Sequence, residues 1–125
     1  MKSVFISYKY EDKPWKERIE ELAKNRRLGD DITITGESED VRQGGNKAIK
    51  NHLGPKIRGA STILVLVGND THNSNGVDYE IQFAKSHRKK VVPARIPDTQ
   101  GGLPDKIRDK DVVAFEPEAI ARAIE

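Results

Sequence analysis

Short β-rich runs alternate with helical segments along the whole chain, and this alternation limits the possible folds more than any other feature. The runs span residues 3–7, 32–35, 61–68, 90–96 and 111–115. Strands that alternate with helices predict a parallel sheet with right-handed crossovers and helices on both faces. The third run is the most apolar, so we expect it to form the central strand, covered on both sides.

The segments between these runs carry helical patterns. Apolar residues at helical spacing predict a first helix over residues 12–25, a third over residues 74–90 and a last helix that begins at Pro117. A second helix, around residues 49–57, is expected to be interrupted by the dipeptide Gly54-Pro55. Five such units in so short a chain fit an α/β three-layer fold of the flavodoxin-like type, with a five-stranded parallel sheet in the order 2-1-3-4-5.

The composition fits one small globular domain over residues 1–125. Apolar residues make up 35% of the chain and charged residues 34%, and the formal net charge is +2. The chain has no cysteine, which excludes disulfides and thiolate metal sites within it. Its three histidines share no metal-ligand spacing, so we expect no metal site.

Partners and location are predicted from charge and apolar patterning. The basic clusters at residues 24–27 and 87–90 lie at predicted helix ends, where they complement the helix dipole, and neither is interleaved with aromatic residues. We therefore expect no nucleic-acid binding. The longest apolar runs are far short of a membrane span, and the early first strand leaves no room for a signal peptide. We expect a soluble, cytoplasmic protein with no membrane contact.

A carboxylate lies within the apolar face of the predicted third helix. At about 100° per residue, Val77, Ile81 and Ala84 gather on one side of a helical wheel. Glu80 falls between Ala84 and Phe83 on the same wheel. An ionised glutamate there is costly to bury unless it is paired, neutralised or opens onto a cavity. In the predicted strand order, ligands bind above the carboxyl ends of strands one and three, so Glu80 is expected at the rim of that crevice.

The loops that follow strands one and three argue against several common functions of this fold. A phosphoacceptor receiver would need an aspartate ending strand three and a lysine ending strand five, but Asp70 comes after Gly68 and Asn69, and strand five runs into Phe115-Glu116-Pro117. A flavodoxin would hold a phosphate in a first loop rich in glycine and hydroxyls, whereas residues 7–12 contain two acids and no glycine. The chain also lacks a Walker loop and a nucleophile elbow.

Three segments together resemble a known family. They are VFISYKYED, KIRGASTILVLVG and SNGVDYEIQFAKSHRKKVVPARI, at residues 4–12, 56–68 and 74–96. In order and spacing they resemble the TIR-like domain of the short bacterial type found in Thoeris anti-phage systems, and the resemblance covers essentially the whole chain. The family has a tryptophan four residues before its catalytic glutamate, whereas this chain has Gly76 there.

The resemblance implies an enzyme whose substrate is NAD and which needs no separate cofactor. By that resemblance Glu80 is the catalytic glutamate that breaks the bond between nicotinamide and ribose, giving ADP-ribose or a cyclic ADP-ribose-type signal. A separate effector protein would sense the signal, and the chain could self-associate through TIR–TIR contacts. The chemistry is consistent, because departure of nicotinamide leaves an oxocarbenium-like ribose that a carboxylate stabilises.

Further residues are expected to bind the substrate. Ser7 and Tyr8 end the first strand beside the crevice and are candidates for contacts with ribose or nicotinamide. By resemblance, further candidates are Phe5, at an apolar family position, and Asp40, Arg42 and Lys47, in the loop that closes over the site. In that loop, Arg42 or Lys47 would meet the diphosphate. Asn69 and His72 are candidates because they lie at the end of the third strand, within reach of the cleft. The structural alternatives are a core phenylalanine, a solvated loop and an exposed histidine.

Two other functions stay open. A non-catalytic TIR-like adaptor would act through self-association, and Gly76 at the tryptophan position is compatible with it. A nucleoside deoxyribosyltransferase-like enzyme would also combine a doubly wound fold with a glutamate at an anomeric carbon. For Glu80 itself, the structural alternative is an ion pair with a residue such as Arg58 or Arg95.

Overall fold

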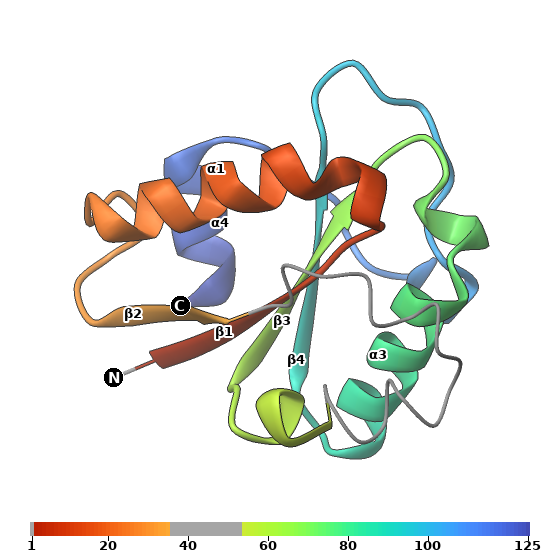
Figure 1. Ribbon diagram of the computed structural model, residues 1–125, viewed down its shortest axis with the longest axis horizontal. Coiled ribbons are helices and arrows are strands. Elements are labelled where there is room, and N and C mark those ends of the chain that lie inside the picture. Colours follow the sequence, from red (N-terminus) through yellow and green to blue (C-terminus); the bar gives the residue numbers. More distant parts are fainter. Residues whose placement is uncertain (1, 36–53) are drawn as a thin grey trace.

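The computed structural model describes residues 2–35 and 54–125. Five parallel strands form one sheet in the order β2-β1-β3-β4-β5 (Figure 1). The strands are β1 (Lys2–Ser7), β2 (Ile32–Thr35), β3 (Thr62–Val67), β4 (Lys90–Arg95) and β5 (Val113–Ala114). The predicted fold class and strand order are therefore confirmed.

Helices cover both faces of the sheet (Figure 1). One face carries α1 (Lys13–Lys24) and α4 (Pro117–Ile124), and the other carries α3 (Asn75–Ser86) and the helical residues 54–58. In the part of the chain that the structure describes, short 3₁₀ turns follow β1, follow β3 and precede β5. They are η1 (Tyr10–Asp12), η3 (Thr71–Asn73) and η4 (Asp105–Ile107).

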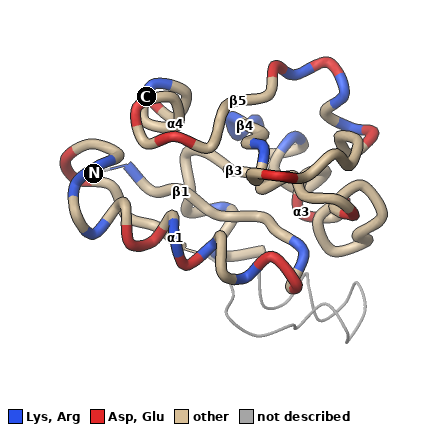
Figure 2. The backbone as a smooth tube through the Cα atoms, turned by 90° about the horizontal axis from the view of Figure 1, so that it is seen from above, with Lys and Arg blue, Asp and Glu red and all other residues tan. Residues whose placement is uncertain are grey.

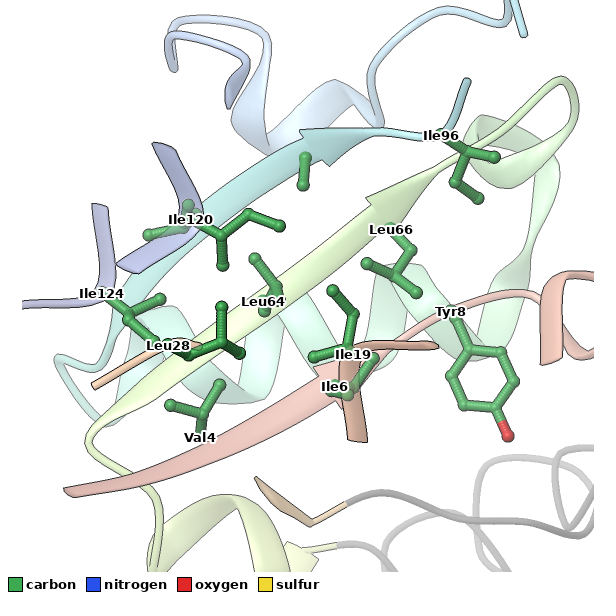
Figure 3. Packing of buried hydrophobic residues seen from close by; sticks show 12 residues of the cluster. Val4, Ile6, Tyr8, Ile19, Leu28, Leu64, Leu66, Ile96, Ile120 and Ile124 are labelled. Atoms are coloured by element: carbon green, nitrogen blue, oxygen red, sulfur yellow. The ribbon is translucent and has the colours of Figure 1, made fainter. Parts of the chain in front are cut away.

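The two faces of β1 contribute to two separate hydrophobic clusters. Val4, Ile6 and Tyr8 pack with α1 and α4 in the cluster shown in Figure 3, whereas Phe5 packs with α3. This pattern is the two-residue alternation of a strand. Every residue of β3 is buried, which confirms the expected central strand. The sheet therefore presents one side of the β1 terminus to α3 and the other side to α1.

Among the described elements, two boundaries differ by more than one residue from those expected from the sequence. β5 has only two residues, Val113 and Ala114, which pair with Ala94 and Arg95 of β4, and the preceding Asp111 and Val112 are exposed. α3 ends at Ser86 and not at residue 90, because Arg88 adopts a φ of 58°, which a right-handed helix cannot include. Both differences shorten an element without moving it.

The dipeptide Gly54-Pro55 forms the first two of the described helical residues 54–58. Gly54 is buried against α3, where a Cβ would lie 3.5 Å from the Phe83 ring. A Cβ at that distance would be in ordinary van der Waals contact with the ring. The predicted interruption of the second helix stays a prediction, because the residues before Gly54 in that helix lie outside the described residues.

Surface charge and apolar length give two further observations. Acidic and basic residues are interspersed along α1, so that helix does not present a single sign of charge (Figure 2). Within the described ranges, no helix combines the length and the apolar character that a bilayer-spanning segment needs.

Candidate active site

The carboxyl end of β1 holds a buried hydrogen-bonded pair. Ser7 is the last residue of β1 and is in register with Val65 of the neighbouring β3. Its Oγ donates a hydrogen bond of 2.6 Å to Oε1 of Glu80, in the second turn of α3. Both residues are 0% exposed. The carboxylate on the apolar face of α3 is thus buried with a hydrogen-bond donor, which offsets part of the cost of burying it.

Apolar side chains and a helix cap fix the position of Glu80. Val77, Ile81 and Ala84 of α3 are buried in the same cluster as Phe5. The helix begins at a serine N-cap, since Ser74 Oγ accepts a hydrogen bond of 3.2 Å from the Val77 N–H. In such apolar surroundings a hydrogen bond to a carboxylate is stronger than it would be in water.

The two arginines considered as ion-pair partners of Glu80 lie elsewhere. The guanidinium carbon of Arg58 is 5.7 Å from the centre of the Phe83 ring. Arg95 ends β4, and its Nη1 is buried without a hydrogen-bond partner. Among the ion pairs of residues 2–35 and 54–125, neither arginine is joined to Glu80. The structure therefore does not support an ion pair with either of them.

An ion pair joins the loops that follow β1 and β3. Lys9 Nζ lies 2.5 Å from Asp70 Oδ2 and 3.1 Å from Glu11 Oε1, and Asn73 Nδ2 donates to Asp70 Oδ1 at 2.6 Å. The hydrogen bonds from Lys9 and then from Asn73 hold the pKa of Asp70 below its ordinary value. The hydrogen bond from Lys9 to Asp70, and then the one from Lys9 to Glu11, raises the pKa of Lys9 above its ordinary value. Since β1 and β3 are neighbours at the switch point, this ion pair spans the predicted crevice.

A buried threonine shapes the turn that ends β3. Thr71 Oγ1 accepts a hydrogen bond of 2.7 Å from the Gly68 N–H and donates one of 3.2 Å to the carbonyl of Leu66. The Asp12 carboxylate lies against Gly68, where a Cβ would come within 2.7 Å of Asp12 Oδ2. Desolvation, and then the charge of Glu11, raise the pKa of Asp12 above its ordinary value. A side chain at position 68 would therefore displace the Asp12 carboxylate.

Replacing Asp70 with Asn should destabilise the chain slightly at neutral pH but not at acid pH. Because the pKa of Asp70 is lowered by folding, the ion pair stabilises the folded chain above the unfolded pKa, and this stabilisation is lost as pH falls through the folded pKa. Thermal melts of wild type and Asp70→Asn should therefore differ at pH 7 and converge in acid, once the pH falls below the lowered folded pKa of Asp70. The difference at pH 7 should be small, because the pair is solvent-screened. A difference in Tm that is independent of pH would contradict this explanation.

The structure brings Ser7 and Glu80 together but places the neighbouring Tyr8 on the opposite face of the sheet. Tyr8 is fully buried in the cluster beneath α1 and α4, at the end of β1 (Figure 3). Phe5 shares the α3 face with Ser7 and is also fully buried, as a core residue. Of the three predicted residues in β1 and just after it, Ser7 is the one seen in contact with Glu80.

The remaining predicted residues follow β3 or fall outside the described part. Asn69 is exposed, and its Oδ1 accepts a hydrogen bond of 2.9 Å from the Gln100 N–H. His72 is exposed in η3. The predicted residues of the closing loop, Asp40, Arg42 and Lys47, lie outside the described residues.

Two more predictions concern metals and the tryptophan position. Over residues 2–35 and 54–125, no three histidine, aspartate or glutamate side chains are grouped so that they could hold a metal ion. Gly76, at the tryptophan position of the family, is buried in the first turn of α3.

Sequence reasoning missed three contributors to this end of the sheet. The first is the Lys9–Asp70 ion pair, for which the mixture of acids and lysine in residues 7–12 was the available signal. The second is Thr71, whose buried position leaves no trace in the sequence. The third is Gly101, where a Cβ would lie 2.3 Å from the carbonyl oxygens of Gly68 and Asn69. A glycine pair in a loop is a signal for such close backbone approach.

Comparisons with known proteins show which family and which solved structure this chain is similar to. The model of the family described as Thoeris protein ThsB, TIR-like domain, matches residues 5–101. The crystal structure of the TIR domain of the Toll-related receptor TRR-2 from Hydra magnipapillata is similar, with a TM-score of 0.66 and 17% sequence identity over 89% of this chain and 82% of that chain. At that identity the likeness shows the fold alone. The comparison with curated proteins found no match.

Proposed function

The chain belongs to the family of the TIR-like domain of Thoeris protein ThsB, and we propose that it is an enzyme that breaks the bond between nicotinamide and ribose in NAD. The observation that carries the proposal is the position of Glu80. Its carboxylate is on the sheet-facing side of α3 and is bound to the last residue of β1, at the end of the sheet where doubly wound folds bind ligands. The resemblance assigns the catalytic glutamate to this same residue.

The proposed reaction breaks the bond between C1′ of the ribose and the ring nitrogen of nicotinamide. The electron pair of that bond leaves with nicotinamide, which departs as a neutral base and needs no acid. C1′ then becomes oxocarbenium-like and positively charged. A preorganised carboxylate in a water-poor site stabilises such a charge far better than water does. Glu80 would supply that carboxylate, in the role that carboxylates have in glycoside hydrolysis.

The acceptor at C1′ decides the product. Water that adds to C1′ and gives up a proton would yield ADP-ribose. An adenine or ribose atom of the same molecule would instead close a ring and yield a cyclic ADP-ribose-type product. In anti-phage defence, such a nucleotide would act as a signal for a separate effector protein.

One set of observations favours a second candidate, a non-catalytic adaptor that acts through self-association. Glu80 is 0% exposed and hydrogen-bonded to Ser7, and Gly76 occupies the position of the family's tryptophan. In an adaptor the Ser7–Glu80 bond would only tether α3 to β1. In the enzyme, NAD must reach Glu80 through a local rearrangement.

Nicotinamide release from NAD by the purified protein, with mass analysis of the nucleotide product, tests the proposal. Protein concentration should be varied up to high values, so that self-association can complete the site. We expect release of nicotinamide, with a product mass that distinguishes ADP-ribose from a cyclic product lacking one water. Self-association without any release would select the adaptor. Reaction of nucleosides but not of NAD would select a deoxyribosyltransferase-like enzyme.

A further inference from the structure

We propose that Ser7 is a positioning residue for the Glu80 carboxylate and not a ligand of the ribose. This inference rests on the proposed function, because it assigns how the reacting carboxylate is held. Its basis is the hydrogen bond of 2.6 Å between two side chains that are both fully buried. It changes the role that the sequence suggested for Ser7.

The hydroxyl proton of Ser7 is already committed. A serine hydroxyl has one proton to donate, and here that proton is directed at Glu80 Oε1. The separation of 2.6 Å falls in the range of about 2.5–2.7 Å that is typical of a hydroxyl donating to an ionised carboxylate. Such a hydroxyl can accept a hydrogen bond from a ribose hydroxyl, but it cannot donate one without releasing Glu80.

Both partners are attached to rigid parts of the fold. Ser7 lies in β1, between β2 and β3 in the sheet, and its register with Val65 fixes its backbone. Glu80 lies on α3 beside the buried Ile81, and the helix start is fixed by the Ser74 cap. A reacting group needs this kind of support, since a small displacement of the group that faces the reacting atom lowers the rate steeply.

The hydrogen bond sets the orientation of the whole carboxylate. With Oε1 bound to Ser7, rotation about the terminal bond of Glu80 would break a buried bond. The plane of the carboxylate, and thus the direction in which it can face C1′, follows from the position of Ser7. The serine would therefore act on the chemical step and not on the affinity for NAD.

Steady-state kinetics of Ser7→Ala and Ser7→Thr with NAD test this inference. We expect Ser7→Ala to lower kcat by about 10–100-fold, the loss that follows from a misplaced reacting group, with little change in KM. Ser7→Thr keeps the hydroxyl and should recover most of kcat. Ser86→Ala is the matched control, because the hydroxyl of Ser86 is exposed, donates to the Phe83 carbonyl at 2.9 Å and lies 3.2 Å from His87 Nδ1. This control should match the wild type.

Two outcomes would overturn the inference while the proposed function stands. A raised KM with unchanged kcat in Ser7→Ala would make Ser7 a substrate ligand. Wild-type kinetics in Ser7→Ala would make the hydrogen bond irrelevant to the reaction. If Ser7→Ala folds poorly, the Ser7→Thr variant provides the test. A fully folded Ser7→Thr protein whose kcat is as low as that of Glu80→Gln would also contradict the inference.

A measurement that needs no activity separates this inference from the proposed function. In thermal melts, Ser7→Ala combined with Glu80→Ala should lose less Tm than the sum of the two single losses, because either single change already removes the hydrogen bond that the two side chains share. Additive losses of Tm would show that the pair is not coupled and would overturn the inference. A wild-type protein that releases no nicotinamide would instead reject the proposed function, whatever this coupling is.

Discussion

Replacing Glu80 with Gln is expected to lower nicotinamide release from NAD by at least about 100-fold, the usual loss when one preorganised charge contact to the transition state is removed. Glutamine has nearly the same shape, and its carbonyl oxygen can accept the hydrogen bond from Ser7. The packing of α3 should therefore persist, and what is lost is the negative charge that would face C1′. Initial rates at saturating NAD, together with Tm, measure both effects.

Asp78→Asn is the matched control for Glu80→Gln. Asp78 is on the same helix, and its two carboxylate oxygens accept hydrogen bonds of 2.9 and 3.0 Å from Lys106 Nζ, in η4. This change removes the same charge from α3 on the side that faces η4, so the rate should stay close to that of the wild type. A Glu80→Gln protein that releases nicotinamide as fast as the control would refute the proposed role of Glu80.

Replacing Gly101 with Ala is expected to lower Tm by roughly 5–15 °C, on the basis of about 1–3 kcal/mol for overpacking. A Cβ at this position would lie 2.3 Å from the carbonyl oxygens of Gly68 and Asn69. Backbone atoms cannot rotate away as a flexible side chain can. The loop after β4 would have to move off the turn that follows β3, which is the turn that leads to Asp70 and its ion pair with Lys9.

Gly102→Ala provides the comparison for Gly101→Ala. A Cβ on Gly102 would have no atom within 4 Å, so the added methyl group meets open space. Its Tm should stay within about 2 °C of the wild-type value, as for other surface substitutions. Equal losses of Tm in the two variants would show that the close contact at Gly101 is not what makes its glycine necessary.

The strand order and the layers could be predicted because they depend on local patterns. The alternation of β-rich runs with helices implies parallel strands, and the unbroken apolar character of β3 identifies the strand that is buried on both faces. The boundaries that were missed depend on single residues. Helix α3 stops where Arg88 takes a left-handed conformation, which the helical periodicity of the preceding residues does not indicate.

The candidate site was predicted only in part. The position of Glu80 on the apolar face of α3 follows from helical spacing, and the structure confirms that this face is buried. Strand alternation implies that Ser7 and Tyr8 point to opposite sides of β1, but it does not say which side α3 will cover. Only the packing of α3 against the Phe5 side of the strand brings Ser7, and not Tyr8, to Glu80.

By itself the sequence determined the class of fold, the central strand and the helix that carries an inward carboxylate, because hydrophobic periodicity is a property of residues close together in the chain. The tertiary structure alone decided that Ser7 donates a hydrogen bond to that carboxylate and that Lys9 forms an ion pair with Asp70. Ser7 and Glu80 are 73 residues apart, and Lys9 and Asp70 are 61 apart. Contacts over such separations depend on the register of β1 against β3 and on the face that α3 covers, and no local pattern encodes either of them.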